Sequence, residues 1–89
     1  MPTVSFTSAL RRFLAAPTCE VEATTVGGAL NAVFAGNPAL RGYVLDDQGA
    51  VRIHVAVYLN GWPIRDRTAL GDPVEPNDDI RVIQALSGG

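Results

Sequence analysis

Residues 24–38, TTVGGALNAVFAGNP, decide the fold class of this chain, because strand-like patterns lie on both sides of them. Within this stretch the apolar residues change from a period of two to a helical period. They fall at positions i, i+4, i+7 and i+8, which form one face of a helix: Val26, Leu30, Val33 and Phe34. The stretch therefore predicts an amphipathic helix inserted between strands.

The ends of this helix carry their own signals. Thr25, or alternatively Thr24, is a candidate N-cap, and Gly36 followed by Pro38 predicts where the helix ends. The Gly27-Gly28 pair in the first turn weakens the helix by up to about 1 kcal/mol per glycine relative to alanine. Tertiary packing must therefore hold the helix in place.

Two short strand patterns precede the helix. Val4 and Phe6 alternate with polar residues, and Cys19, Val21 and Ala23 alternate with two glutamates. The second strand should therefore be apolar on one side and acidic and solvated on the other. We expect Cys19 to pack as a small hydrophobic residue rather than to act as a reactive thiol.

Further strand patterns follow the helix. An alternating run ends directly before Asn60-Gly61, the strongest short signal for a hairpin: Val55, Val57 and Leu59. Residues 62–64 contain a proline and predict an edge strand. Residues 80–84 predict the last strand.

The remaining segments are expected to be loops. The sequence predicts irregular structure over residues 37–50, with a turn at 46–49, and another turn at 76–79. We expect Leu70 to reach the core from a loop. We expect Trp62 to be packed rather than to bind a ligand, with a position at an interface beside the edge strand as the alternative.

The resulting order is strand, strand, helix, strand, short strand, strand, which is typical of the α+β class. One helix can cover one face of one sheet. We therefore predict a β-grasp fold over residues 1–84, with a mixed four- to five-stranded sheet wrapped on one main helix. Residues 85–89 are expected to form a flexible C-terminal tail ending in Gly-Gly.

Composition limits the classes of function. The 89 residues suit a single domain, and seven basic against nine acidic residues give a net charge of −2, which argues against nucleic-acid binding. A single cysteine excludes an internal disulfide, and no Cys/His cluster predicts a metal site. No stretch is typical of a signal peptide or of a membrane span, so we expect a cytoplasmic protein that binds no membrane.

Five groups of residues, taken in chain order, carry a resemblance that covers nearly the whole sequence. They are Val4–Phe6 with Leu10-Arg11-Arg12, Thr25-Val26 with Leu30, Val57-Tyr58-Leu59-Asn60-Gly61, Pro76-Asn77-Asp78-Asp79-Ile80, and Ala85-Leu86-Ser87-Gly88-Gly89. Together they make the chain similar to the ubiquitin-like sulfur carriers of the MoaD/ThiS group. Its length and the loop after the helix resemble the MoaD-like and CysO-like members most. The Gly27-Gly28 pair departs from the group, which usually has better helix formers there.

The resemblance implies that the chain is a sulfur carrier, a protein co-substrate and not an enzyme. An E1-like adenylating enzyme would use ATP to activate the carboxylate of Gly89, and sulfur would replace AMP to leave a thiocarboxylate. The chain itself would bind no cofactor. The sulfur would pass to an acceptor synthase, for molybdopterin, cysteine or methionine, thiamine or another thio-metabolite. A MoaD-like member would be the small subunit of a synthase, and a CysO-like member would have a JAMM-type metalloprotease as a further partner.

The chemistry of activation accounts for the composition of the tail. A free carboxylate is a poor electrophile, and a mixed anhydride with AMP supplies a good leaving group. The activating enzyme must align that carboxylate with ATP in a narrow site, which Gly88 and Gly89 can enter because they carry no side chains. Ser87 and Leu86 are then expected at the mouth of the channel, with Leu86 as an apolar anchor.

The strand pattern also predicts a partner-binding face. Tyr58 in the third strand, and Arg81 and Ile83 in the last strand, should point away from the helix. Tyr58 and Ile83 would form a small apolar patch beside the tail, and exposed apolar patches with polar rims often mark partner sites.

Two alternatives to the sulfur carrier stay open. A ubiquitin-like modifier would use the same activated Gly89, which a lysine amine of a target protein would attack. Both routes begin with adenylation, so the sequence does not separate them. The second alternative is a β-grasp interaction module whose tail is never activated. The sequence does not identify the pathway that receives the sulfur.

Overall fold

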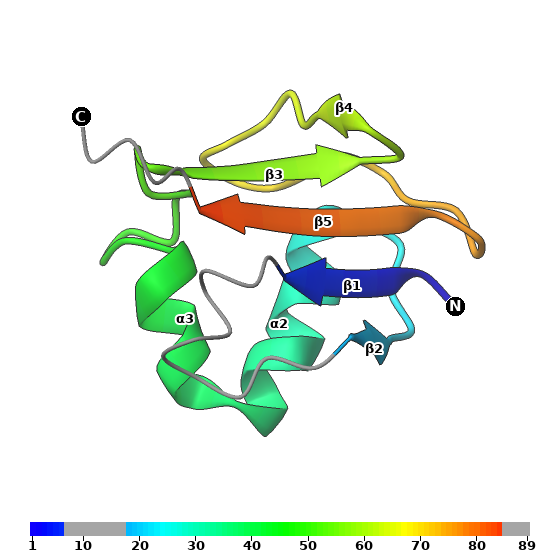
Figure 1. Cartoon of the computed structure of the whole chain (residues 1–89), viewed down its shortest axis with the longest axis horizontal. Coiled ribbons are helices and arrows are strands. Elements are labelled where there is room, and N and C mark those ends of the chain that lie inside the picture. The colour runs from blue at the N-terminus through cyan, green and yellow to red at the C-terminus, as the bar shows by residue number, and fades with distance from the viewer. Residues whose placement is uncertain (7–17, 85–89) are drawn as a thin grey trace.

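The computed structural model of the chain describes residues 1–6 and 18–84. The residues of the resemblance at 10–12, and the tail at 85–89, lie outside the described part. The helices and strands are β1 (Thr3–Phe6), β2 (Cys19–Glu20), α2 (Val26–Gly36), α3 (Pro38–Val44), β3 (Val55–Leu59), β4 (Trp62–Pro63) and β5 (Asp79–Gln84). Figure 1 shows both helices packed on the same face of the sheet.

The sheet has five strands in the order β2-β1-β5-β3-β4. The central pair, β1 and β5, is parallel, whereas the three outer pairings are antiparallel. This mixed sheet with helices on one face is the β-grasp, so the predicted fold class is confirmed. Proline-containing β4 lies at the edge of the sheet, as predicted.

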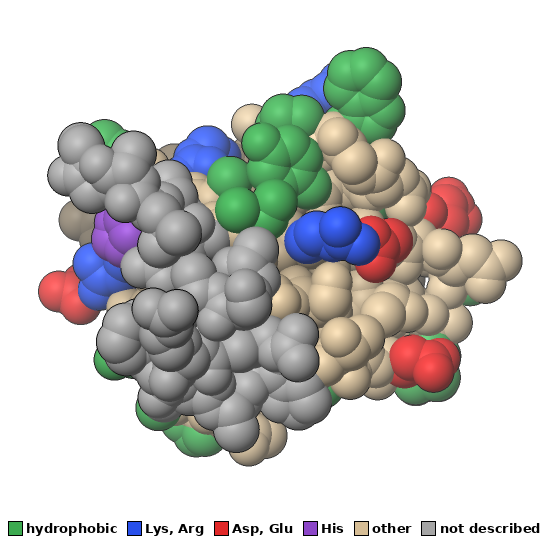
Figure 2. Space-filling model, in the orientation of Figure 1, with side chains coloured by type: hydrophobic (Ala, Val, Ile, Leu, Met, Phe, Trp, Pro, Cys, Tyr) green, Lys and Arg blue, Asp and Glu red, His purple; other side chains and the backbone are tan. Residues whose placement is uncertain are grey.

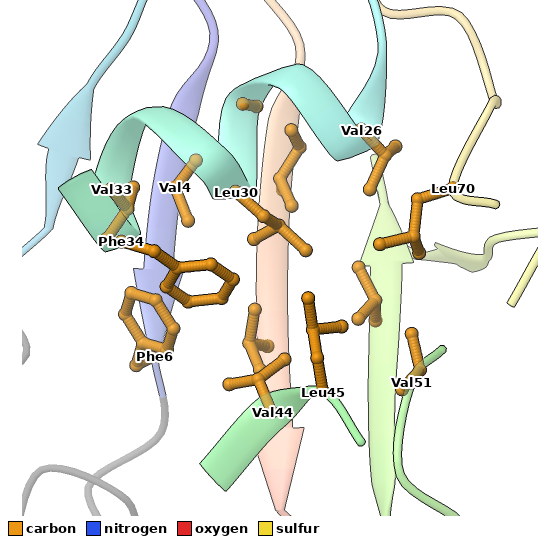
Figure 3. Close-up of a cluster of buried hydrophobic side chains, with 14 of the residues drawn as sticks. Val4, Phe6, Val26, Leu30, Val33, Phe34, Val44, Leu45, Val51 and Leu70 are labelled. Atoms are coloured by element: carbon orange, nitrogen blue, oxygen red, sulfur yellow. The ribbon is translucent and has the colours of Figure 1, made fainter. Parts of the chain in front are cut away.

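The core lies between the inner face of the sheet and the helices. All four residues of the predicted helical face are buried, and α2 turns them toward the strands (Figure 3): Val26, Leu30, Val33 and Phe34. The strands contribute every second residue to the core. In β5 these residues are Ile80 and Val82, and both are fully buried. Apolar residues spaced with a period of 3.6 on the helix thus pack against apolar residues spaced with a period of two on the strands.

Helix α2 begins and ends where the sequence predicts. The hydroxyl of Thr25 accepts a hydrogen bond from the N–H of Gly28 at 3.0 Å, which identifies Thr25 as the N-cap. At the other end Asn37 is the C-cap, and its N–H donates to the carbonyl of Phe34. Pro38 cannot continue this helix, because it lacks an N–H.

The expectation of irregular structure over residues 37–50 is wrong for its first half, which forms α3. Pro38 occupies the first turn of α3, where a missing N–H is not needed by the helix. Leu40 and Val44 lie four residues apart and are both buried. The fold therefore has a second, shorter helix beside the main one. The predicted turn at residues 46–49 is confirmed, with a bond from the N–H of Gly49 to the carbonyl of Asp46.

The glycine pair in α2 has a tertiary explanation. The N–H of Gly27 donates to the carbonyl of Leu70 at 2.8 Å. A Cβ on Gly27 would lie 3.1 Å from that same carbonyl oxygen and 3.2 Å from the Cβ of Leu70. Leu70 is buried, as predicted, and it adopts a left-handed backbone conformation with φ of 57°. Gly27 thus allows the loop that carries Leu70 to approach the helix closely.

We expect a glycine-to-alanine change to raise the stability of the protein at Gly42 in α3 and to lower it at Gly27 in α2. Gly42→Ala in α3 adds a Cβ with nothing within 4 Å, so it should raise the free energy of unfolding by about 0.5–1 kcal/mol. Gly27→Ala should lower the free energy of unfolding by about 1 kcal/mol. The new Cβ would crowd the carbonyl oxygen of Leu70, which the hydrogen bond from the N–H of Gly27 holds in place. Urea unfolding of both variants measures the difference. A stabilised Gly27→Ala variant would contradict the close approach to Leu70.

Two expectations near the sheet edges need correction. Strand β2 ends at Glu20, whereas the alternating pattern extended to Ala23. The pattern of faces is right, since Val21 is buried and Glu22 is exposed. The strand is shorter because the chain leaves β1 and pairs instead with another segment, through the bond from the N–H of Val74 to the carbonyl of Thr24.

Trp62 is 76% exposed, so the expectation that it is packed is wrong. It lies in the two-residue edge strand, where its only strand neighbour is β3. A large side chain there has no second strand to pack against.

Within residues 1–6 and 18–84, no helix is long and apolar enough to cross a membrane.

Candidate functional site

The end of β5 positions the predicted tail. Strand β5 runs parallel to β1 and antiparallel to β3, and its last residue, Gln84, is paired with Val55 at the start of β3. We call this point the tail exit (Figure 1). Four of the predicted site residues lie beyond it, outside the described residues, and their roles stay predictions: Leu86, Ser87, Gly88 and Gly89.

The other predicted site residues share the outer face of the sheet. Tyr58 is paired with Arg81, and Ala56 with Ile83, and residues paired in this way point to the same side. Their neighbours in the strands, Val57 and Val82, are buried on the opposite side. The predicted orientation of Tyr58, Arg81 and Ile83 is therefore confirmed, whereas their role in binding stays a prediction.

These residues line a shallow hollow on the outer face. Its volume is about 430 Å³, and it is lined by Tyr58, Asn60, Gly61, Asp79, Arg81 and Ile83. Figure 2 views this face and shows hydrophobic side chains over β3 and β4, next to a basic and an acidic side chain. Tyr58 and Ile83 supply apolar surface to this hollow, and Asp79 and Arg81 supply charge. Surfaces that bind other proteins contain such mixtures of apolar and charged groups.

Arg81 is only weakly held at the rim of this hollow. Its guanidinium lies 3.7 Å from the carboxylate of Asp79, and the two side chains are 60% and 46% exposed. An ion pair with this exposure contributes little to stability, because water and salt screen it. Arg81 can therefore turn to a carboxylate on a partner at small cost.

The side chain of Asn60 has a role that the sequence did not predict. Its amide group donates to the carboxylate of Asp78 at 2.9 Å and accepts from the N–H of Asp79 at 2.8 Å. Asn60 and Gly61 have φ angles of 54° and 87°, as the predicted hairpin turn requires. Because turn geometry alone accounts for an asparagine here, this contact has no separate signal in the sequence. Two of the groups that carry the resemblance thus meet beside the hollow.

The same amide lowers the pKa of Asp78. Its hydrogen bond to the carboxylate is the main cause, and the N–H of Glu75 adds to it. The folded-state pKa lies below the ordinary value of 3.8, so this carboxylate stabilises the fold above that pH. The contribution is lost as the pH falls through the folded-state pKa.

We expect Asn60→Gly to raise the pKa of Asp78 toward its ordinary value. Glycine keeps the positive φ of the turn but removes the side-chain donor. A carboxyl-detected NMR titration measures this pKa. Asp66 is the internal control, because backbone N–H groups of Ala69 and Gly71 hold its pKa at about 2 in a different loop. An unchanged Asp78 titration would contradict the assigned cause.

The comparisons with known proteins agree with this geometry. No protein family model matches the chain. It is 35% identical over 65 residues to small archaeal modifier protein 1 of Haloferax volcanii, which covers 73% of this chain and 70% of that protein. The crystal structure of that organism's SAMP1 superposes with a TM-score of 0.77 at 26% identity, covering 99% of this chain and 98% of that one.

A second solved structure is similar in fold. The crystal structure of the BexX/CysO complex from Amycolatopsis orientalis contains a chain that matches with a TM-score of 0.84 at 21% identity, and the match covers 100% of both chains. The described residues therefore share the β-grasp fold with that chain.

Proposed function

Because the chain belongs to the ubiquitin-like family of small modifier and sulfur carrier proteins, we propose that it carries sulfur on its C-terminal glycine. In this proposal an E1-like enzyme adenylates the carboxylate of Gly89, and sulfur displaces AMP to give a thiocarboxylate. The chain is a co-substrate in this cycle and binds no cofactor of its own. ATP is consumed by the activating enzyme.

One observation carries this proposal. The sequence places two glycines five and four residues after Gln84, the last residue of the central parallel strand. That strand is paired with β1 as far as Val82 and with β3 as far as Gln84, so its pairing with β3 fixes the point from which the tail departs. A fixed base and a segment without bulky side chains suit a chain end that must be aligned with ATP in the active site of another protein.

The proposed partners follow from this chemistry. An E1-like adenylating and sulfurtransferase enzyme supplies the thiocarboxylate, and an acceptor synthase receives the sulfur. The CysO of Amycolatopsis orientalis was solved in a complex with BexX, so the same fold forms a complex with another protein there. The hollow at Tyr58, Arg81 and Ile83 is the proposed contact surface. A CysO-like role would add a JAMM-type metalloprotease, and we place the cycle in the cytoplasm.

A ubiquitin-like modifier is the second candidate, because the 35% identical relative is a small archaeal modifier protein. In that role a lysine amine on a target attacks the activated Gly89. All seven basic side chains among the 89 residues are arginines. A guanidinium stays protonated and does not act as an acyl acceptor, unlike a lysine amine. We therefore expect such conjugates to carry single copies rather than lysine-linked chains of this sequence.

Mass spectrometry separates these functions. The protein is incubated with its activating enzyme, ATP and a sulfide source, and its intact mass is measured. Replacement of one oxygen by one sulfur supports the carrier. Gly-Gly remnants on lysines of cellular proteins support the modifier. An unchanged mass, together with no remnants, would overturn both and favour an interaction module that is never activated.

A further inference from the structure

A tight turn of residues 52–55, which we call the exit turn, exposes an apolar side chain beside the tail exit. The N–H of Val55 donates to the carbonyl of Arg52 at 3.0 Å and closes the turn. Ile53 at its tip is 98% exposed, although Val51 and Val55 on either side are 7% and 2% exposed. The chain therefore leaves the core, presents one isoleucine to solvent, and returns.

Hydrogen bonds from two directions hold the exit turn. The guanidinium of Arg67 donates to the carbonyls of Arg52 and Val55, at 2.8 and 2.7 Å. The Nε of Arg52 donates to the carbonyl of Gly42 in α3 at 2.7 Å, and its N–H donates to the carbonyl of Val44 at 3.0 Å. Few residues of the turn are thus free to move, and little conformational entropy remains to be lost when Ile53 is buried by a partner.

The exit turn lies at the tail exit because of the sheet register. Val55 is the residue paired with Gln84, so the turn directly adjoins the last pair of β3 and β5. Strand β5 runs toward this end of the sheet (Figure 1). Tyr58 and Arg81 lie three residues further back along both strands, whereas Ile83, which also lines the hollow, is the neighbour of Gln84. A protein that encloses the chain beyond Gln84 therefore approaches the end of the sheet at which the exit turn lies.

We propose that Ile53 is a docking contact for the enzyme that takes up the tail, and that it fits an apolar pocket at the mouth of that enzyme's channel. This inference rests on the proposed function. Single exposed apolar side chains are common and need no explanation by themselves. Ile53 differs through its almost complete exposure, its rigid support and its position at the tail exit. The exit turn extends the predicted contact surface from the outer face of the sheet to the strand ends.

The test measures the kinetics of ATP-dependent activation by the E1-like enzyme of the same organism, with release of pyrophosphate as the signal. Ile53→Asp should raise the KM for this protein about tenfold or more and leave kcat unchanged, because burial of the side chain positions the tail without touching the reacting atoms. Ile53→Val should restore most of the affinity. Circular dichroism confirms that each variant is folded.

Ala32→Asp is the matched control. Ala32 is also exposed and apolar, and the change adds the same charge, but it lies in α2 on the opposite face of the sheet from the hollow. Its KM should stay at the value of the unchanged protein. If Ile53→Asp and Ala32→Asp behave alike while the unchanged protein is activated, the docking role of Ile53 is wrong and the proposed function stands. If the unchanged protein is not activated, the proposed function fails, and the role of Ile53 fails with it.

Discussion

Deletion of Gly89 abolishes ATP-dependent activation and leaves the domain folded; this is the largest effect we expect. The proposed reaction forms an anhydride between the terminal carboxylate and AMP, so shortening the chain by one residue withdraws the reacting carbon by up to about 3.6 Å. A displacement of even 1 Å can reduce the rate about a hundredfold. Gly89→Val should have a similar effect, because a branched side chain needs space beside the reacting carbon.

The measurement is adenylate formation, followed as pyrophosphate release and as intact mass after sulfide is added. Gly36→Ala is the matched control, since a Cβ on this helix-terminal glycine meets nothing within 4 Å. It should be activated like the unchanged protein. The thermal unfolding midpoint of the shortened protein should also be unchanged. Normal activation of a folded protein without Gly89 would refute the role of this residue.

The second large effect is expected on the outer face of the sheet. The double change Tyr58→Ser and Ile83→Ser should raise the KM for activation by about thirtyfold to a hundredfold, with kcat little changed. Both side chains line the same hollow, and their loss removes apolar area that a partner would bury. Their effects on binding are expected to be coupled rather than additive, because one partner surface would cover both.

Tyr43→Ser provides the control for this prediction. Tyr43 is 43% exposed and lies on α3, on the other face of the sheet. Its replacement should leave KM unchanged. Charge can be tested in the same assay, since Arg81→Glu should raise KM most at low ionic strength if Arg81 meets a carboxylate on the partner. A double variant that is activated as well as the Tyr43→Ser variant would exclude the hollow as the contact surface.

Local patterns were sufficient to predict most of the fold. Val26, Leu30 and Phe34 repeat with the period of a helix, and Ile80 and Val82 with the period of a strand. Such periods are set by backbone geometry, so they can be read from a single sequence. The turn at Asn60-Gly61 was equally readable, because few residues other than glycine and asparagine adopt a positive φ at low cost.

The errors arose where one residue has two roles or where neighbours are missing. Pro38 follows the end of α2, and a proline there predicts a helix end. The same residue also begins α3, which this prediction did not include. Leu40 and Val44 carried a short helical pattern, but seven residues give too little periodicity to distinguish a helix from a loop. Trp62 was expected to be packed because tryptophan is large and apolar, whereas its place on a two-residue edge strand leaves it exposed.

Some features of the candidate site were also predictable from the sequence, and others were not. The diglycine at residues 88–89 and the outward direction of Tyr58, Arg81 and Ile83 were available from the sequence alone. The contact of Asn60 with Asp78, and the exit turn at residues 52–55, were not. Asn60 and Asp78 are distant in the chain, and the exit turn is held by bonds to the likewise distant Gly42 and Arg67. Nothing in one of these segments specifies the other.

The sequence by itself determined the period of each element, the positions of the main turns and the composition of the tail, because these depend on neighbouring residues and on backbone sterics. Only the tertiary structure decided which of these elements meet. Three contacts depend on the register of the whole sheet. They are the close approach of Gly27 to Leu70, the hydrogen bond from Asn60 to Asp78, and the place of the exit turn beside Gln84. That register buries apolar residues of several elements at once, so no single stretch of sequence encodes it.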